Sequence, residues 1–431
     1  MTDTHGLPAD ARRSRRDFLK HSTAIATGAL AVDSLLARTA HAAGSDVLKL
    51  GLIGCGGRGS GAAGNAFAAD PNLKLTALAD AFGDRLSASL VQLKQANPER
   101  IAVEPDRCFV GFDAFEKLLA TDVDVVILAT PPHFRPAHLK AAIASGKHVF
   151  CEKPVAVDAP GVRSVLETTE EAKKKNLSIV SGLCYRYDRP KQQLIARVHD
   201  GAIGKMVAMQ VSYNTGSLWH HGRKPEWSDM EYQLRNWLYF HWLSGDFNVE
   251  QHIHSLDKAS WAMHDEPPLR ATGLGGRQVR VDEQWGNIYD HFSVVYEYAD
   301  GVKLFAQCRQ MPGCSIDVSD HLLGTGGSAE MMRGVIDGPS AWRYHGPKLN
   351  MYEEEHKALF AGIRSGNPLN NGLYMARSTM LAIMGRMASY SGQTLTWDQC
   401  LNSTEDLTPP KYEWGSIPLA PVAKPGLTRF V

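Results

Sequence analysis

The sequence predicts an α/β chain of two domains, a doubly wound parallel sheet followed by an α+β domain with a large, open, mostly antiparallel sheet. Three observations predict this. An apolar run, 47–53, leads directly into a glycine-rich turn. Apolar strand-like runs then alternate with helical runs as far as residue 186. From residue 187 onward, long alternating segments joined by short turns replace that pattern, as expected for antiparallel strands.

The glycine-rich turn lies between a predicted strand and an Ala-rich predicted helix, the context in which G-x-G-x-x-G binds a dinucleotide. The first glycine permits the tight turn, the second lets the backbone approach a pyrophosphate, and the third lets helix and strand pack closely. The helix N-terminus then faces the phosphate charge. The predicted cofactor-binding turn consists of Gly54, Cys55, Gly56, Gly57, Arg58 and Gly59. This is the fingerprint of a Rossmann domain.

An acidic residue at the end of the second predicted strand indicates which dinucleotide binds. The run "LKLTALAD" ends in Asp80, about twenty residues after the glycine turn, as the fingerprint expects. A carboxylate there accepts hydrogen bonds from the ribose hydroxyls and repels a 2′-phosphate. The sequence therefore favours NAD over NADP, and Arg85 nearby keeps NADP as the alternative.

Further strands are predicted at 123–130, 147–154 and 177–183, with helical runs between them. In doubly wound sheets, ligands bind beyond the carboxyl ends of the strands. Two motifs lie at such ends and complete the predicted cofactor site. They are Thr130-Pro131-Pro132-His133 and Glu152-Lys153-Pro154.

The predicted domains are 46–186, which binds the nucleotide, and 187–400, which binds substrate and mediates oligomerisation, followed by a C-terminal tail at 401–431. Long strands are expected in 204–213, 287–311 and 321–331. Two late amphipathic helices, near 353–366 and 374–392, carry Met and other apolar residues at three- and four-residue spacing. We interpret them as packing elements.

The first forty-odd residues have the features of an export signal. Arg15 and Arg16 precede a weakly apolar run, and a small-x-small cleavage site follows at 40–42. Residues 1–42 are therefore predicted to be a twin-arginine signal peptide, which places the mature protein in the periplasm. Equal numbers of acidic and basic residues give no reason to expect nucleic acid or a membrane surface as partner.

Three stretches together resemble the glucose-fructose oxidoreductase / inositol dehydrogenase / rhizopine-catabolism (Gfo/Idh/MocA) family. They are "GLIGCGGRG", "ATPPHFRPAHLKAAIASGKHVFCEKPVA" and "EQHIHSLD". The resemblance implies that Lys153 lies beside the nicotinamide and the hydroxyl that is oxidised. It also implies a homo-oligomer. Arg135 stands where many members have histidine, which leaves the contacts of that loop with substrate open.

The segment "VEQHIHSLD" has several interpretations. On a helix, Glu250 and His254 share a face, whereas His252 projects elsewhere. The resemblance implies that His254 transfers the proton, with Glu250 in place of the family's usual Asp. We expect Lys153, His254 and Glu250 to be catalytic. One alternative is a divalent metal held by Glu250 and His254, with His241 as the candidate third ligand, whose spacing in the sequence does not clearly fit that role. The other alternative is an ordinary structural helix.

Aromatic and polar residues gather upstream of that segment. Rings can cover the apolar face of a sugar while Arg and His contact its hydroxyls, although each tryptophan alone is equally consistent with a core position. The predicted substrate-binding residues are Arg186, Tyr187, Trp219, Arg235, Trp237, His241 and His252.

The resemblance thus implies an NAD-dependent oxidoreductase acting on a secondary alcohol of a sugar, glycoside or polyol, with no resident metal. One alternative is a glycoside hydrolase that retains NAD and oxidises the sugar transiently at C3 before elimination. The other is a non-enzymatic sugar-binding protein on the same fold.

Overall fold

A computed structural model describes residues 47–431, so the predicted signal peptide lies outside the described residues. The first sheet has six parallel strands in the order β3-β2-β1-β4-β5-β6. Its central strands are apolar and buried because helices cover both faces. The strands are β1 (Leu48–Ile53), β2 (Leu73–Asp80), β3 (Cys108–Val110), β4 (Val125–Leu128), β5 (His148–Cys151) and β6 (Ile179–Ser181). This confirms the predicted doubly wound sheet.

Five helices connect these strands. The longest begins where the Asp158 carboxylate accepts a hydrogen bond from the Gly161 amide, and lysines lie in its last turn. The connecting helices are α2 (Gly57–Ala69), α3 (Gly83–Ala96), α4 (Ala114–Leu119), α5 (Arg135–Ala144) and α6 (Ala159–Lys174).

The second sheet has nine strands in the order β14-β13-β12-β11-β7-β10-β9-β8-β15. Only the β7–β10 pair is parallel, which confirms the prediction of a mostly antiparallel sheet. The strands are β7 (Met206–Thr215), β8 (Arg270–Gly276), β9 (His291–Glu297), β10 (Lys303–Gln310), β11 (Asp317–Gly324), β12 (Ser328–Glu330), β13 (Val335–Asp337), β14 (Trp342–Arg343) and β15 (Leu395–Thr396).

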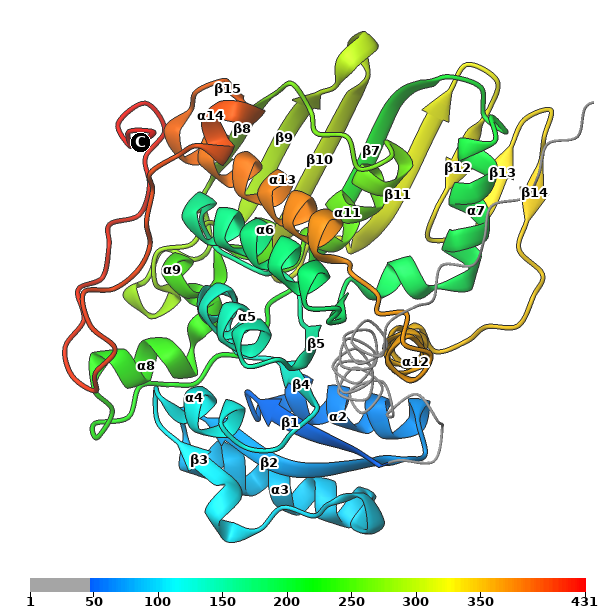
Figure 1. Ribbon diagram of the computed structural model, residues 1–431. Helices are drawn as coiled ribbons and strands as arrows, with labels where there is room; N and C mark the ends of the chain where they lie inside the picture. The colour runs from blue at the N-terminus through cyan, green and yellow to red at the C-terminus, as the bar shows by residue number, and fades with distance from the viewer. Residues whose placement is uncertain (1–46) are drawn as a thin grey trace, which may run out of the picture.

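Helices cover one face of this sheet (Figure 1). The opposite face exposes apolar side chains, among them Val207, Leu274 and Phe305. The expected homo-oligomer stays a prediction. The helices of this region are α7 (Arg189–His199), α8 (Asp229–Arg235), α9 (His241–Ser244), α10 (Phe247–Glu250), α11 (Ile253–Ala262), α13 (Gly372–Ser391) and α14 (Trp397–Leu401).

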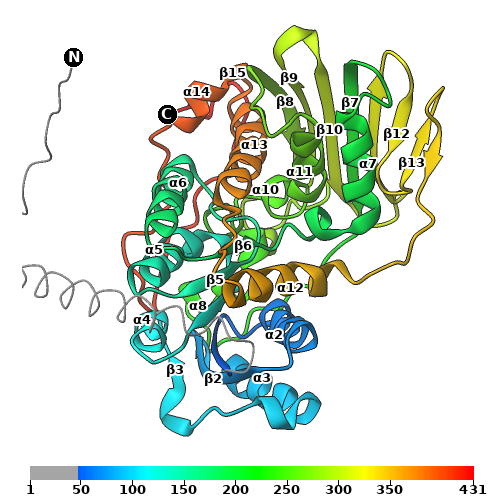
Figure 2. The ribbon, with the colours of Figure 1, turned by 45° about the vertical axis from the view of Figure 1, so that its right-hand side comes forward.

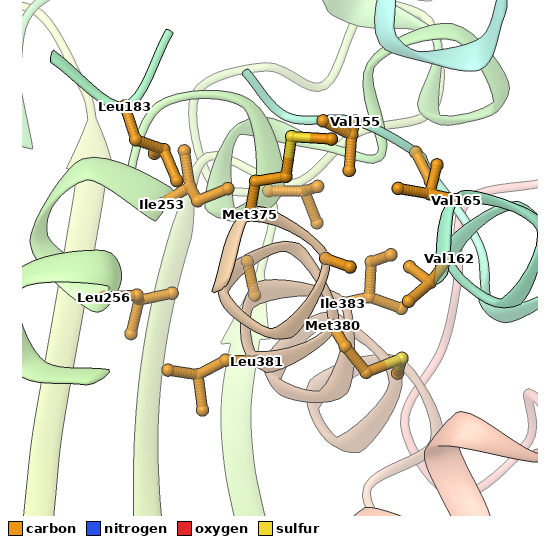
Figure 3. Packing of buried hydrophobic residues seen from close by; sticks show 14 of the residues in the cluster. Val155, Val162, Val165, Leu183, Ile253, Leu256, Met375, Met380, Leu381 and Ile383 are labelled. Carbon is orange, nitrogen blue, oxygen red and sulfur yellow. The ribbon is translucent and has the colours of Figure 1, made fainter. Parts of the chain in front are cut away.

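Helix α13 lies between the two domains and is buried along almost its whole length. Figure 3 shows its Met375, Met380, Leu381 and Ile383 between Val162 and Val165 of α6 on one side and Ile253 and Leu256 of α11 on the other. As a result, the segment after β5 and the helix that carries His254 pack against the same support. The predicted role of this helix as a packing element is confirmed.

The domain boundaries are crossed twice by later parts of the chain. Helix α12 (Met351–Arg364) packs beside α2 on the first domain, as both views show (Figures 1 and 2). The Arg364 guanidinium there pairs with Asp70 at 2.6 Å. The segment after α14, red in Figure 1, runs back down to α8 and the nucleotide domain. The C-terminal tail is therefore part of the folded body. Among residues 47–431, none of the helices has the length and apolarity needed to span a bilayer.

Candidate active site

An open pocket of about 650 Å³ lies at the carboxyl ends of β1, β2 and β4. Ligands bind at this edge in doubly wound sheets because the strand order reverses there. The lining of the pocket includes Gly54, Gly56, Asp80, Phe82, Arg85, Phe112, Thr130 and Pro131.

The glycine turn has the space that a pyrophosphate requires. Gly54 has φ +97°, and a Cβ on it would lie 2.6 Å from the Ala129 carbonyl carbon. A Cβ on Gly59 would lie 1.9 Å from the Gly54 oxygen, so α2 packs against β1 only with glycine there. Beside Gly56 and Gly57, in contrast, no atom lies within 4 Å of an added Cβ. The open volume faces the N-terminus of α2, where amide groups favour anionic ligands. The turn therefore fits a dinucleotide.

Asp80 has the position that sequence reasoning assigned to it. Its carboxylate accepts hydrogen bonds from the Cys55 amide at 2.6 Å and the Phe82 amide at 2.8 Å, which fixes it at the floor of the pocket. Burial raises the pKa of this carboxyl group above its usual value. Each oxygen keeps a second lone pair for a ribose hydroxyl. The Arg85 side chain lines the same pocket.

Two other predicted cofactor residues, Arg58 and Glu152, contact each other. Their side chains form an ion pair, and Glu152 is buried. A second guanidinium nitrogen of Arg58 lies 3.7 Å from the buried carboxylate of Glu355 on α12, and the Arg58 guanidinium lies over the Tyr352 ring. Burial raises the pKa of Glu355 well above its usual value. Arg58 thus ties the glycine turn to the Glu-Lys-Pro segment and to α12.

Lys153 and the "VEQHIHSLD" segment meet at the interface between the domains. The Lys153 ammonium donates to the Glu250 carboxylate at 2.7 Å and to the Glu250 carbonyl at 2.6 Å. An ammonium group has three hydrogens, so one remains for a substrate hydroxyl. Burial and the charge of Lys153 hold the pKa of His254 well below its usual value. Its buried Nδ1 has no hydrogen-bond partner among the described residues. The group is therefore a neutral imidazole beside an ammonium.

The helix under this site is not continuous, so the prediction of one helix carrying both side chains is wrong. Helix α10 ends at Glu250, and α11 begins at Ile253. At the break, the His252 amide bonds to the Phe247 carbonyl, five residues earlier, at 3.1 Å. Because the turn is widened there, the regular 100° spacing does not place Glu250 relative to His254. Glu250 is placed instead by its bond to Lys153.

Three predicted substrate-binding residues are engaged inside the fold. The Arg186 guanidinium pairs with Asp257 at 2.8 Å and with Asp265 at 2.5 Å. The Tyr187 hydroxyl donates to Asn371 at 2.7 Å. His252 is fully buried, with its Nδ1 3.1 Å from the Asn248 side-chain oxygen. The contacts of Arg186 and Tyr187 use the polar groups that a substrate needs, so we reassign these two to structural roles. Nε2 of His252 has no hydrogen-bond partner among the described residues, and its predicted contact with substrate stays a prediction.

The other predicted substrate residues belong to a cluster around α8 and α9. Arg235 pairs with Asp84 at 3.0 Å and covers the Phe82 ring, at the end of the pocket marked by Asp80. The rings of Trp219 and Trp237 lie 6.2 Å apart, and Trp219 is half exposed. The Asn287 amide lies 2.5 Å from Nδ1 of His241. Arg235 therefore faces the nucleotide domain, which corrects its assignment to the sugar.

The metal alternative required Glu250, His254 and His241 to converge. Within residues 47–431, no three His, Cys, Asp or Glu side chains are grouped so that they could hold a metal ion. The arrangement around Lys153 is instead that of an ammonium, a carboxylate and an imidazole.

Comparison with known proteins agrees with this geometry. Residues 48–180 match the oxidoreductase family with NAD-binding Rossmann fold that is named Gfo/Idh/MocA. The inositol 2-dehydrogenase of Rhizobium meliloti is 27% identical over 345 residues, which is 76% of this chain and 93% of that protein. Residues 48–180 therefore form the NAD-binding Rossmann domain of the Gfo/Idh/MocA oxidoreductase family.

Other relatives of this chain have a second kind of activity in their names. A glycosyl hydrolase family 109 protein of Solibacter usitatus is 30% identical over 214 residues, 47% of this chain and 46% of that protein. Among solved structures, the aldose-aldose oxidoreductase of Caulobacter crescentus superimposes with a TM-score of 0.62 at 18% identity, over 81% of this chain and 99% of that one. That likeness shows the shared fold.

Sequence reasoning missed some residues at the centre of this oxidoreductase. The Tyr185 ring lies edge-on to His254 at 5.5 Å and under the Lys258 ammonium at 4.1 Å. Lys258 pairs with the buried Asp320 at 2.5 Å, and its charge contributes to the lowered pKa of His254. Tyr185 directly precedes Arg186 in the sequence. The sequence therefore indicates the right segment, but the side chain that contacts His254 is Tyr185 and not Arg186. Arg135 is buried and donates to the Pro154 carbonyl at 2.5 Å, next to Lys153.

Buried histidines predict that this protein loses stability in mild acid. Burial lowers the pKa of His133 and His241 to about 4 and that of His252 to about 3. Below the unfolded value of about 6.5, the unfolded chain binds protons that these folded histidines do not, so the free energy of unfolding falls as the pH drops from about 7 to about 4. Carboxyl groups whose pKa burial raises oppose this, Asp246 to about 6 and also Asp80, Asp158 and Glu355, but the histidines whose pKa is lowered are more numerous, since His138, His254 and His356 belong to them as well.

The urea midpoint should therefore be lower at about pH 5 than at about pH 7.5. An equal or higher midpoint in acid would contradict the neutral, buried state of the histidines.

Proposed function

We propose that this protein is an NAD-dependent oxidoreductase that acts on a secondary alcohol of a sugar, glycoside or polyol. The observation that carries the proposal is the contact of Lys153 with Glu250, which joins the end of β5 to the segment of His254 across the two domains. Relatives named inositol 2-dehydrogenase support the substrate class. The bound dinucleotide would accept the hydride, held by the glycine turn and Asp80.

Each catalytic side chain then has a defined role. Lys153 donates its third hydrogen to the substrate hydroxyl and stabilises negative charge that develops on that oxygen. His254 takes up the hydroxyl proton because its low pKa keeps it neutral and its Nδ1 has no partner among the described residues. Glu250 contacts Lys153 through two oxygens and sets the direction of the ammonium group.

The direct test is a panel of alcohols with purified protein and NAD. Myo-inositol, scyllo-inositol and common aldoses should be compared through the absorbance of reduced nicotinamide. Oxidation of at least one cyclic polyol or sugar is the expected result. If simple linear alcohols react and no cyclic carbohydrate does, the proposed substrate class is wrong.

We further propose that the dinucleotide is NAD. A carboxylate at Asp80 repels a 2′-phosphate, whereas Arg85 and Arg235 lie close enough to attract one. Asp80→Asn keeps one acceptor oxygen and removes the charge. It should shift the ratio of NADP to NAD affinities toward NADP by about tenfold or more, because placing like charges together is costly. Fluorescence titration with NADH and NADPH measures that ratio.

The matched control for this charge is Asp113→Asn, at a carboxylate that is mostly exposed and pairs with Lys117. Its affinity ratio should equal that of the wild type. A ratio that is unchanged in Asp80→Asn would show that Asp80 does not select the cofactor.

A second candidate function is a redox-neutral glycosidase that keeps its NAD. The similarity to glycosyl hydrolase family 109 proteins favours it. Transient oxidation and re-reduction of one sugar molecule requires no second redox partner, and the same Lys153 and His254 would serve both half-reactions. Release of nitrophenol from a nitrophenyl glycoside without added NAD would identify this reaction, whereas steady production of free NADH would identify the dehydrogenase. Export of the loaded protein through a signal in residues 1–42 stays a prediction.

A further inference from the structure

We infer that residues 407–417, called here the C-terminal strap, retain the dinucleotide by closing the adenosine end of its pocket, with Trp414 as the residue that clamps it. The inference rests on dinucleotide binding by the glycine turn, and it holds whichever sugar reacts. The strap follows the last helix, α14, and has no helix or strand of its own.

The strap crosses the loops that follow three neighbouring strands of the first sheet. Trp414 contacts Phe82, after β2, at 5.3 Å between ring centroids and Phe112, after β3, at 4.7 Å. The Tyr412 hydroxyl lies 2.7 Å from Nε2 of His133, after β4. Adenosine binds at the carboxyl ends of these strands in doubly wound sheets. The strap therefore lies over the part of the chain that must hold the adenosine.

The two phenylalanines are the physical link between strap and ligand. Phe82 and Phe112 both line the pocket, from separate loops. The Trp414 ring contacts both, so it holds the two loops at a fixed separation. Trp414 itself is half exposed, at 47%, and its ring contacts among the described residues are those with Phe82 and Phe112. Aromatic pairs in this geometry add stability beyond that of buried area.

The second domain holds the strap in place from the other side. The Met230 amide donates to the Gly415 carbonyl at 3.0 Å, and the Ser416 hydroxyl donates to the Asp229 carboxylate at 2.9 Å. Both partners belong to α8. Leu234 of the same helix lines the pocket. Strap and α8 thus form a continuous cover that joins the two domains above the adenosine site.

The strap can open without disturbing either sheet. It pairs with no strand, and its Trp414 and Tyr412 are 47% and 40% exposed, so the middle of the strap is less buried than its end at Ile417. Segments with few buried contacts open locally at low free-energy cost. Release of the dinucleotide would then wait for this opening. Slow release suits an enzyme that uses one cofactor molecule over many turnovers.

The test is the dissociation rate of NADH from the full-length mature protein, measured by its fluorescence after a chase with excess NAD. Trp414→Ala should raise that rate by about tenfold or more, since two aromatic contacts are lost. Trp414→Phe should restore slow release at least in part. Mass spectrometry of unfolded samples should find nucleotide retained through gel filtration by the wild type and lost by Trp414→Ala.

Leu427→Ala is the matched control, because this side chain is 77% exposed on the same C-terminal segment. Its dissociation rate should equal that of the wild type, and the melting temperatures of all variants should agree closely. Tyr412→Phe removes the hydroxyl that contacts His133 but keeps the ring, and should raise the rate by a smaller factor. Equal rates for wild type, Trp414→Ala and Tyr412→Phe would overturn the inference, even if the sugar oxidation proposed above were observed.

Discussion

Lys153→Met should lower turnover by about 10²–10⁴-fold while the dinucleotide remains bound. The ammonium is the one group placed to donate to the substrate hydroxyl from the end of β5, and methionine fills a similar volume without a donor. Glu250 then loses its partner, but its side chain has access to solvent at 12% exposure and can be hydrated. The rate is measured on whichever alcohol of the panel reacts fastest.

Lys147→Met controls for the loss of a lysine just before the same strand. Lys147 precedes β5 and donates to the Thr121 carbonyl, so it lies at the end of the strand opposite to Lys153. Its replacement should leave turnover unchanged. The NADH affinity of Lys153→Met should stay close to that of the wild type. Unchanged turnover in Lys153→Met would remove the lysine from the mechanism.

Arg186→Met should lower the free energy of unfolding by about 3–5 kcal/mol, because it leaves the buried carboxylate of Asp257 without its partner. Asp257 is 1% exposed and also accepts a hydrogen bond from Ser378 on α13, so the effect spreads to the helix between the domains. Urea denaturation measures the loss. The folded fraction should keep the KM of the wild type.

The control for this arginine is Arg333→Met, whose guanidinium pairs with Glu330 on the surface and is 63% exposed. Exposed pairs contribute about 1 kcal/mol or less, so its stability should barely change. A raised KM with unchanged stability in Arg186→Met would show that the side chain binds substrate after all, as the sequence suggested.

The fold could be predicted from sequence because its signals are local and redundant. Strands such as β1 and β4 are buried on both faces and appear as short apolar runs, and the glycine turn occurs where a Cβ on Gly54 or Gly59 would collide with the neighbouring backbone. Each signal is a property of a few consecutive residues. Because these local signals agree with one another, they predict a single arrangement of strands and helices.

The site could be predicted only where a motif fixes the backbone. Lys153 follows β5 directly, so its position follows from that of the strand. Arg186 and Tyr185 are adjacent in a 3₁₀ turn, and neither propensity nor spacing indicates which side chain faces His254. The choice depends on Asp257 and Asp265, which lie more than seventy residues away and hold the arginine.

The role of the C-terminal strap was even harder to predict from the sequence than that of the site residues. Residues 407–417 have no periodic pattern, and the sequence suggested only a tail. Their role follows from contacts with residues about three hundred positions earlier, such as Phe112 and His133. Long-range contacts of this kind are formed by the completed fold.

A crystal structure of the protein purified with its own cofactor, soaked with its best alcohol, tests the central claim most directly. The account predicts a nicotinamide ring at the end of β5, with the reacting hydroxyl about 3 Å from both the Lys153 ammonium and the His254 imidazole. A ring bound elsewhere, or a hydroxyl that contacts neither side chain, would contradict it.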